Sequence, residues 1–358
     1  MSQSLTKNIT IEVFNDFTKE LEECWVEFEK KSNHYFFQSF IWQKTWYQQQ
    51  KKYQKKVINY SIIVKNINEI VMIIPLNIDY SYGVKKLCWS GFPFSDYNAP
   101  LIKKDYDIKQ ESFLIIWEKI INCNKDFDCI CFDNLPEKIS NLYNPFFKFL
   151  KKKINNYSYG IEFNEIFKIK KKELANIKYQ TNRLKNLGKL DFKTAMTNED
   201  SSKILNFIIS NKSKQYDRTN AWNLFNLIIH RELFESSNSN MNENIDLSYL
   251  VLDDHIIAAQ YGYKYNKRYY YLFPTYKYEY RKFSPGKILL QKMIEKRKLE
   301  SFNFFDLTIG SEDYKEKFSN YKMASALFLQ SKNLRGLIYI SLLKIKYLIK
   351  SKINNDKS

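Results

Sequence analysis

The stretch "FSPGKILLQKMIEKRK", residues 283–298, decides the fold because it joins a helix start to an evenly spaced apolar face. Ser284 is a favoured N-cap residue, since its hydroxyl can accept a hydrogen bond from an orphan backbone N–H. Pro285 suits the first helical position, which needs no N–H. Gly286 leaves the backbone open to approach. The stretch predicts a helix whose first turn can hold an anion, with a well-capped helix that binds nothing as the simpler interpretation.

Composition places the chain among packed globular proteins. Its 358 residues are enough for two sizeable cores. Hydrophobic residues make up 44% and aromatic residues 17%, which excludes an intrinsically disordered chain. Only 8 glycines and 7 prolines are present, which excludes a collagen-like or linker-rich protein.

The formal net charge of +18 favours anionic partners such as nucleic acid, acidic lipid or phosphate-bearing small molecules, without choosing among them. The five cysteines contain no C-x-x-C pair, so we expect free thiols in a reducing cytoplasm and no metal site. The start "MSQSLTKNIT" is too polar for a signal peptide, and no apolar run is long enough to span a bilayer. We therefore expect a cytoplasmic protein.

Hydrophobic spacing predicts an alternation of helices and strands in each half of the chain. In the first half we expect helices at 18–31, 36–50, 111–123 and 144–154, a hairpin over 57–80 with its turn at 65–69, and a buried strand at 127–136. In the second half we expect helices at 177–189, 202–216, 221–236 and 313–318, a polar loop at 236–246, a three-strand meander over 247–276 and a strand at 302–310.

The repeated order of elements predicts two similar domains. Each is an α/β (α+β) layer, in which helices cover a mixed, mostly antiparallel sheet. We place the N-terminal domain at 1–160, the C-terminal domain at 161–330 and a basic amphipathic helix at 331–358. That last helix either packs onto the body of the protein or contacts an anionic membrane surface at the inner membrane face.

Several of these segments resemble motifs of the GNAT-superfamily acyltransferases. Within that superfamily the chain resembles the tandem CelD-like family, which is named for cellulose biosynthesis and is related to the FemAB peptidoglycan aminoacyltransferases. The resemblance covers about residues 35 to 325 and implies two tandem GNAT-like domains. The segments that carry it are "FQSFIWQKTW" (37–46), "SDYNAPL" (95–101), "DDHIIAAQYGY" (253–263), "FSPGKILL" (283–290) and "DLTIGSEDYKEKF" (306–318).

The resemblance implies an N-acyltransferase that moves an acyl group from a thioester donor, acyl-CoA, to an amine. The acceptor it suggests is an amino sugar in surface polysaccharide biosynthesis. Ser284, Gly286 and Lys287 would bind the donor's pyrophosphate at the helix start. Tyr314 would protonate the departing thiolate. Lys315 would pair with a phosphate or polarise the carbonyl.

Four further residues are candidates for the site. Asp306 lies on an apolar strand, where a buried acid needs a partner. It could act as a base, orient Lys315 or make only a structural hydrogen bond. Asp96 and Tyr97, in a Pro-flanked loop, and Arg183, in a basic helix, are candidate substrate contacts. No Ser/His/Asp or Cys/His arrangement stands out, so we expect direct attack and no tightly bound cofactor.

Two alternatives stay open at this point. The superfamily's Arg/Gln-x-x-Gly-x-Gly/Ala loop is not intact before the helix, and FemAB-like relatives use aminoacyl-tRNA instead of acyl-CoA. The first alternative is therefore an aminoacyl-tRNA-dependent transferase, with tRNA as the weaker partner prediction. The second is a non-catalytic anion-binding module on a degenerate GNAT scaffold.

Overall fold

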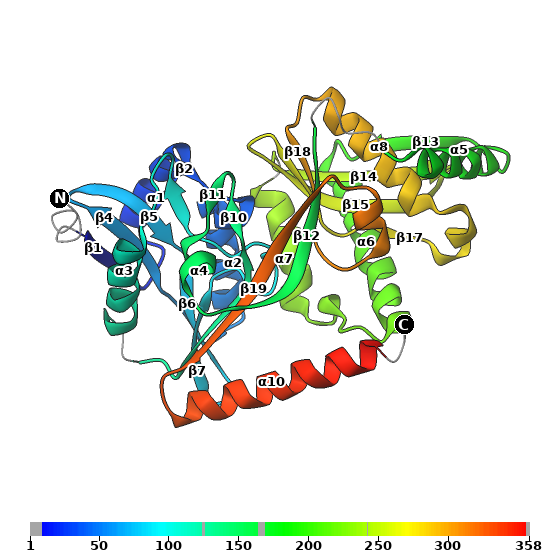
Figure 1. Cartoon of the computed structure of the whole chain (residues 1–358). Coiled ribbons are helices and arrows are strands. Elements are labelled where there is room, and N and C mark those ends of the chain that lie inside the picture. The colour runs from blue at the N-terminus through cyan, green and yellow to red at the C-terminus, as the bar shows by residue number, and fades with distance from the viewer. Residues whose placement is uncertain (1–8, 124–125, 164–168, 242, 356–358) are drawn as a thin grey trace. The chain divides into compact units, whose positions relative to one another are not determined.

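The computed structural model describes residues 9–123, 126–163, 169–241 and 243–355, so the polar start at 1–8 lies outside the described residues. The chain divides into two compact units (Figure 1). The first consists of Met1–Asn156 with Ala324–Ser358, and the second of Tyr157–Met323. The last helix thus lies with the first unit, while the division into domains at 160 and 330 stays a prediction.

The first unit is a mixed α/β layer. It contains the sheet β1-β4-β5-β8-β2, the two-stranded sheet β10-β11 and the strands β19-β9-β7-β6-β3 of a larger sheet. Its helices are α1 (Lys19–Lys31), α2 (Phe40–Lys52), α3 (Gln110–Cys123), α4 (Pro145–Phe149) and α10 (Leu334–Asn355), with the 3-10 turn η1 (Phe36–Gln38). Its strands are β1 (Ile9–Phe14), β2 (Ser32–Asn33), β3 (Val57–Asn59), β4 (Ser61–Asn66), β5 (Glu69–Ile74), β6 (Leu76–Ser81), β7 (Val84–Trp89), β8 (Leu101–Lys103), β9 (Cys129–Pro136), β10 (Lys138–Ile139) and β11 (Leu142–Tyr143). Strands β12 (Lys153–Glu162) and β19 (Tyr321–Ser331) run across the division between the units.

Local signals explain the helix α1. The Thr18 hydroxyl accepts a hydrogen bond from the backbone N–H of Leu21 at 3.2 Å and caps the helix start. Leu21, Trp25 and Phe28 follow at helical spacing and are buried in one core cluster. The predicted helices at 18–31 and 111–123 are therefore confirmed as α1 and α3, and the predicted hairpin as β4 and β5.

The second unit holds one six-strand arrangement in the order β13-β14-β15-β16-β18-β12. The predicted meander is confirmed, with left-handed turn residues at Asp253 and Asn266. The strands are β13 (Leu190–Thr194), β14 (Ile245–Leu252), β15 (His255–Tyr265), β16 (Arg268–Tyr271), β17 (Thr275–Tyr276) and β18 (Phe304–Ile309). The helices are α5 (Lys171–Lys185), α6 (Asn198–Thr219), α7 (Ile228–Asn240), α8 (Pro285–Leu299) and α9 (Asp313–Lys317), with the 3-10 turns η2 (Leu224–Asn226) and η3 (Tyr278–Phe283).

Three sequence predictions of local structure were wrong. The helix expected at 144–154 ends at Phe149, because Lys153 and Ile154 already belong to strand β12. The helix expected at 221–236 begins at Ile228 and runs to Asn240, into the segment that we expected to be a polar loop. Strands β12 and β19 were not predicted at all.

Each unit contains one strand–helix–strand crossover with a parallel strand pair. In the first unit, α3 lies in the chain between β7 and β9, which pair in parallel. In the second unit, α8 lies in the chain between β16 and β18, which also pair in parallel. The other pairs of described strands in the second unit are antiparallel. Both units therefore have the mostly antiparallel, helix-covered sheet expected from the sequence.

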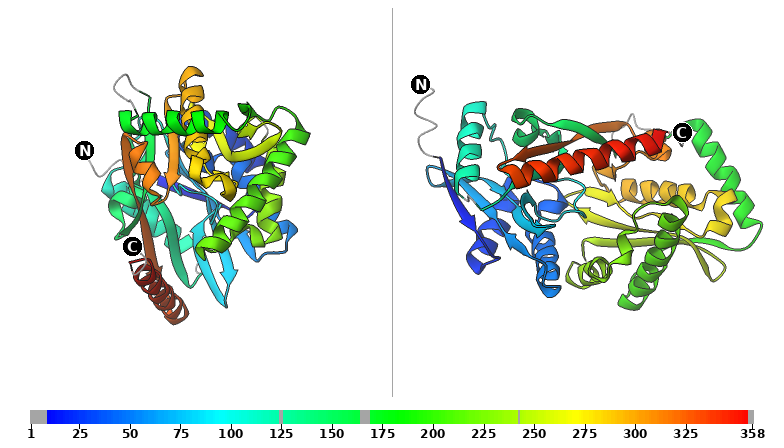
Figure 2. Two further views of the ribbon diagram at one scale, coloured as in Figure 1. Left: turned by 90° about the vertical axis from the view of Figure 1, so that its right-hand side faces the viewer. Right: turned by 90° about the horizontal axis from the view of Figure 1, so that it is seen from below.

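The sheet of the second unit has helices on both faces (Figure 1 and Figure 2). Neighbouring residues on β15 point to opposite faces. Gln260 Nε2 lies 4.0 Å from Met293 Sδ on α8, whereas the Tyr261 ring centroid lies 5.3 Å from that of Phe234 on α7. Helix α8 thus covers one face and α7 the other.

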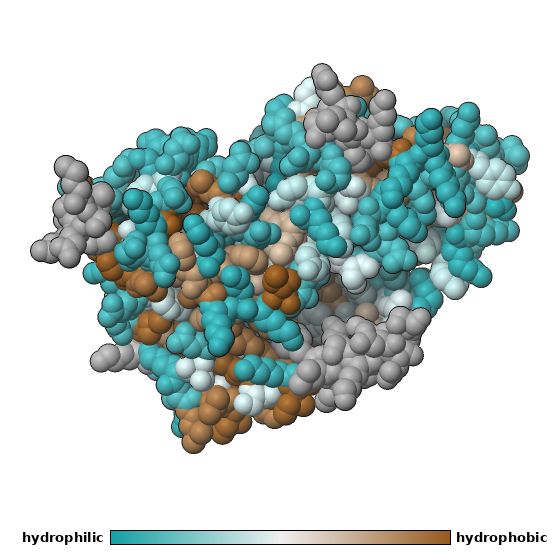
Figure 3. Space-filling view, in the orientation of Figure 1, coloured by the Kyte–Doolittle hydropathy of each residue, from teal (hydrophilic) through white to brown (hydrophobic). Residues whose placement is uncertain are grey.

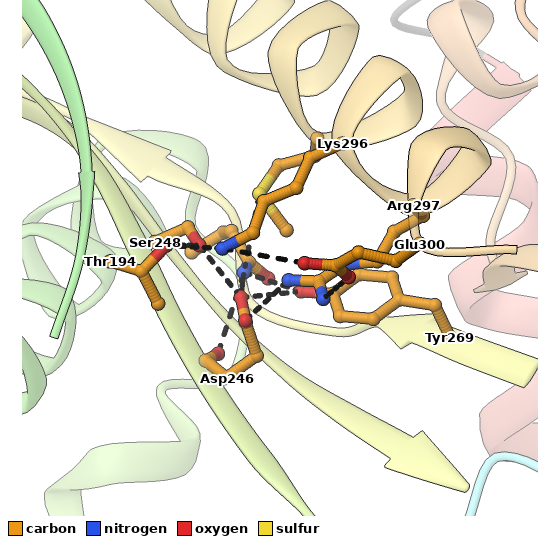
Figure 4. Close-up of polar contacts among 9 residues, drawn as sticks. Thr194, Asp246, Ser248, Tyr269, Lys296, Arg297 and Glu300 are labelled. Atoms are coloured by element: carbon orange, nitrogen blue, oxygen red, sulfur yellow. Dashed lines mark hydrogen bonds and ion pairs between the residues drawn. The ribbon is translucent and has the colours of Figure 1, made fainter. Parts of the chain in front are cut away.

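A buried polar network joins α8 to this sheet (Figure 4). The Arg297 guanidinium on α8 forms ion pairs with Asp246 on β14 and with Glu300. Asp246 Oδ1 also accepts from Ser248 Oγ at 2.7 Å and from Gln260 Nε2 at 3.0 Å. Because Asp246 and Arg297 are almost fully buried, each depends on the other for its charge to be tolerated.

We predict that Asp246→Ala lowers the free energy of unfolding by about 3–5 kcal/mol, because it leaves the Arg297 charge buried without its main partner. The matched control is Glu295→Ala, which breaks an exposed pair with Lys292 on the same helix and should cost about 1 kcal/mol or less. Equilibrium urea denaturation measures both values. Equal losses in the two variants would contradict the anchoring role of Asp246.

Candidate functional site

The parallel strands β16 and β18 stop pairing with each other near their carboxyl ends. Their register runs only as far as Tyr270 opposite Asp306. Beyond it, the backbone N–H groups of Leu272 and Phe273 both donate to the carbonyl of Tyr261 on β15, at 3.1 and 3.2 Å. Strand β18 keeps its pairing with β12 on its other side. The backbone edges of β16 and β18 that face each other are therefore not paired to each other here.

Asp306 shapes the end of β18. Its buried Oδ2 accepts from both Nε and a terminal nitrogen of Arg268 at 2.8 Å. Its Oδ1 accepts from the backbone N–H of Thr308, also at 2.8 Å. Thr308 has φ +60°, an uncommon conformation for a β-branched residue. These contacts favour the structural hydrogen bond that the sequence left open for Asp306, and its role as a base stays a prediction.

Lys315 is held close to the same strand end. Its buried ammonium donates to the carbonyl of Ile309 at 2.7 Å and pairs with Glu312 at 3.2 Å. A Cβ atom on Gly310 would lie 2.1 Å from Glu312 Oε2 and 2.4 Å from Lys315 Nζ, so a side chain here would displace both groups. The absence of a side chain at Gly310 thus lets the predicted site residue Lys315 approach the end of β18.

Tyr314 packs on the core under α8 beside Lys315. Burial raises the pKa of its hydroxyl well above the usual value, and nearby Tyr271 and Glu312 raise the pKa further. The hydroxyl therefore stays protonated at neutral pH, which a proton donor requires. This supports the predicted role of Tyr314 without testing it.

Lys212 is a candidate that the sequence analysis missed. It lies on α6, and its Nζ donates to the carbonyl of Pro274 at 3.1 Å, in the segment that leaves β16. Burial lowers the pKa of Lys212 to about 8, with Glu312 opposing this shift and Lys315 adding to it. No signal in the sequence sets this residue apart from Lys214, two positions along the same helix.

The start of α8 differs from its prediction. Ser284 precedes Pro285 as expected, but its backbone is left-handed, with φ +50°, and its hydroxyl makes no capping hydrogen bond. The Ser284 carbonyl instead accepts from the N–H groups of Lys287 and Ile288, at 3.0 and 3.3 Å. A Cβ atom on Gly286 would lie 3.5 Å from the Tyr276 ring, an ordinary contact. Packing alone therefore does not require glycine at this position.

Two basic residues predicted to contact ligands lie beside this helix start. Lys287 Nζ pairs with Glu173 on α5 at 3.1 Å. Arg183, also on α5, lies with its guanidinium carbon 4.9 Å from the ring centroid of Phe283. The structure thus brings Arg183, Ser284, Gly286 and Lys287 to one end of α8.

Asp96 and Tyr97 lie in the first unit, in the loop before β8, apart in sequence from the other candidates. The Tyr97 ring stacks on Tyr35 at a centroid distance of 4.5 Å, and its carbonyl accepts from Gln38 Nε2 at 2.6 Å. Tyr97 is buried and Asp96 half-buried. Their contact with a substrate stays a prediction.

Comparison with known families places the site inside a matched domain. Residues 171–316 match the family model of an acetyltransferase (GNAT) domain, and this span includes Lys212, Tyr314 and Lys315. No curated protein matches the sequence.

Solved structures show the same fold over nearly the whole chain. The crystal structure of FemX has a TM-score of 0.62 at 12% identity, covering 91% of this chain and 99% of that one. The L-PGS from Bacillus licheniformis has a TM-score of 0.54 at 13% identity, covering 90% and 94%. A tandem GNAT protein from the clavulanic acid biosynthesis pathway has a TM-score of 0.50 at 8% identity, covering 91% and 99%.

The sequence resemblance and the predicted fold class are thereby confirmed. Residues 171–316 of the second unit match a GNAT acetyltransferase domain, and the fold of the whole chain is similar to that of FemX and of the tandem GNAT protein.

We predict that Gly310→Ala strongly reduces turnover, because the added methyl group would displace the Lys315 ammonium and the Glu312 carboxylate. The matched control is Gly83→Ala in the first unit, which also has a positive φ (+73°) but has no atom within 4 Å of the new Cβ. Turnover and urea denaturation separate the two effects. Similar turnover in both variants would contradict a role for the position of Lys315 in setting the rate.

Proposed function

We propose that the second unit transfers an acyl group from a thioester donor, acyl-CoA, directly to an amine. The observation that carries this proposal is that Tyr314 and Lys315 lie near the strand ends where β16 and β18 stop pairing. Acyl transfer needs a donor to the carbonyl oxygen as it becomes an oxyanion and a proton for the leaving atom. A buried ammonium and a protonated phenol supply these two functions.

The start of α8 supports a phosphate-bearing donor. The N–H groups of Lys287 and Ile288 donate to the Ser284 carbonyl, whereas that of Gly286, in the same turn, does not. The positive end of the helix dipole also favours an anion at this place. Arg183 supplies a nearby positive charge. Gly286 carries no side chain, so a pyrophosphate could approach the backbone closely.

A second candidate donor is aminoacyl-tRNA. Two first-turn amides of α8 are already satisfied by Ser284, and Lys287 is paired with Glu173, which weakens a pyrophosphate site. The net charge of +18 suits a large polyanion. The similarity to FemX in fold agrees with this candidate.

For the acceptor we propose an amine, and we take an amino sugar of a surface polysaccharide as the first to test because of the CelD-like resemblance. Asp96 and Tyr97 would then contact the sugar. The place of reaction would be the cytoplasm.

We predict that Tyr314→Phe lowers turnover with nearly unchanged donor affinity, because the hydroxyl is needed only as the leaving atom departs. Thermal shifts with acetyl-CoA, aminoacyl-tRNA and heparin identify the donor, and release of the free thiol or tRNA measures turnover. Equal stabilisation by every polyanion, without turnover, would favour the non-catalytic binding module.

Helix α10 supports a second proposal, peripheral contact with an anionic membrane. One face packs on the first unit, where Ile340 is buried against Val84 and Cys129. Figure 3 shows apolar side chains on the outside of its first turns. Among the described residues, no helix is both long and apolar enough to cross a bilayer. On the part of α10 whose side chains the structure describes, the apolar residues that are 50–72% exposed are Leu334, Leu337, Ile338, Leu342 and Ile345.

Exposed apolar residues at helical spacing beside basic ones form the pattern of an interfacial helix. We therefore predict that Leu337→Ser combined with Leu342→Ser reduces attachment to phosphatidylglycerol vesicles by at least tenfold, since each leucine contributes about 1.5–3 kcal/mol when buried. Leu299→Ser, which removes an even more exposed leucine (86%) in the second unit, is the control. Vesicle co-sedimentation measures binding, and equal binding by all variants would reject the proposal.

A further inference from the structure

Two lysine side chains lie at the two strand ends that part in the second unit. Lys315 Nζ donates to the carbonyl of Ile309, where the chain leaves β18, and Lys212 Nζ donates to the carbonyl of Pro274, where it has left β16. The two come from opposite parts of the sequence, on α9 and α6. We infer that Lys212 is the general base that takes the proton from the attacking amine, an inference that rests on the proposed acyl transfer.

The other ionisable groups at this place have competing partners. Asp306 is occupied by Arg268 and by the N–H of Thr308. Glu312 pairs with Lys315, and its side chain is 56% exposed. Tyr314 is kept protonated by burial and so serves as an acid. Lys212 is thus the described group best suited to accept a proton.

The surroundings of Lys212 allow it to lose its own proton near neutral pH. Burial is the main cause that lowers its pKa to about 8, and the positive charge of Lys315 acts in the same direction. Glu312 opposes these effects, and the Tyr216 ring lies 5.6 Å from Nζ on the same helix. A base with a pKa near 8 is about one-tenth neutral at pH 7 and about half neutral at pH 8.

The proposed step balances with these groups alone. The acceptor nitrogen forms a C–N bond to the donor carbonyl carbon while the C–S bond, or the C–O bond of an ester donor, breaks. The proton that leaves the acceptor nitrogen passes to neutral Lys212, which becomes an ammonium. The departing sulfur or oxygen takes the Tyr314 proton, and exchange with solvent returns both side chains to their starting forms.

The ionisation of Lys212 can be measured without any donor. The full-length protein is labelled with a trace of acetic anhydride between pH 6 and 11, and mass spectrometry follows the labelling of Lys212 and of exposed Lys214. We expect a midpoint near 8 for Lys212, well below the ordinary lysine value of about 10.4. Coincident midpoints would overturn the inference.

The role in catalysis is tested by the pH profile of turnover. In the unaltered protein, turnover should rise with pH up to about 8 and then level off. Lys212→Arg keeps the positive charge and a donor to Pro274 but cannot lose its proton, so turnover should fall about 100-fold or more and its rise with pH should disappear. Lys214→Arg should behave like the unaltered protein.

The outcomes separate this inference from the proposed function. Wild-type turnover in folded Lys212→Arg would show that only the charge matters and would overturn the inference while leaving acyl transfer intact. If no donor supports turnover, the proposed function fails, and the labelling midpoint decides on Lys212 by itself. A midpoint near 8 supports a Lys212 side chain that can lose its proton near neutral pH, and a midpoint equal to that of Lys214 rejects this.

Discussion

The buried ion pair between Asp246 and Arg297 fixes the position in which the second unit presents the start of α8. Apolar contacts alone would hold this helix to the sheet without a preferred direction. A buried ion pair has one good geometry, since a misplaced partner leaves a charge in the core. Arg297 lies late in α8 and Ser284 at its beginning, so anchoring the one sets the rotation and height of the other. The placement of Gly286 and Lys287 therefore depends both on the packing of Ile288 and Leu289 beside them and on an interaction at the far end of the helix.

A second constraint comes from the peptide groups at the strand ends. When β16 and β18 stop pairing, their carbonyl groups need other donors, because buried polar groups are costly when unsatisfied. Lys212 and Lys315 supply two of these donors, at Pro274 and Ile309. A lysine that satisfies a carbonyl also brings a positive charge to the same place. At Ile309 the backbone donor is the same ammonium, that of Lys315, which the proposed transfer would use at the oxyanion.

Features with local causes could be predicted from the sequence. Helix α1 has its cap at Thr18 and its apolar residues at helical spacing, and the meander has turn residues at Asp253 and Asn266. The prediction that the Ser284 hydroxyl caps α8 was wrong, because Ser284 also ends the preceding turn η3 and has a left-handed backbone. Strand β12 was not predicted, because most of its first residues are polar and because its partner β18 lies far along the chain.

The candidate site was predicted in part for the same reason. Tyr314 and Lys315 stand in a recognisable segment, whereas Lys212 lies in a helix rich in lysine and gains its character only from tertiary burial. The partner of Asp306 is Arg268, on another strand, so the sequence could state that a partner was needed but could not name it. The parting of β16 and β18 is a property of register and left no sequence pattern that we could read.

The two candidate donors differ in what they require of Tyr314. A thiolate is a comparatively stable leaving group, since a thiol has a pKa of about 8.5, below the ordinary tyrosine value of about 10. Burial raises the pKa of Tyr314 still further, so its proton would pass reluctantly to sulfur. The alkoxide that leaves an ester is far more basic and would take the same proton readily. Loss of the Tyr314 hydroxyl should therefore slow transfer from an ester donor more than transfer from acyl-CoA, in which Lys315 would carry more of the stabilisation.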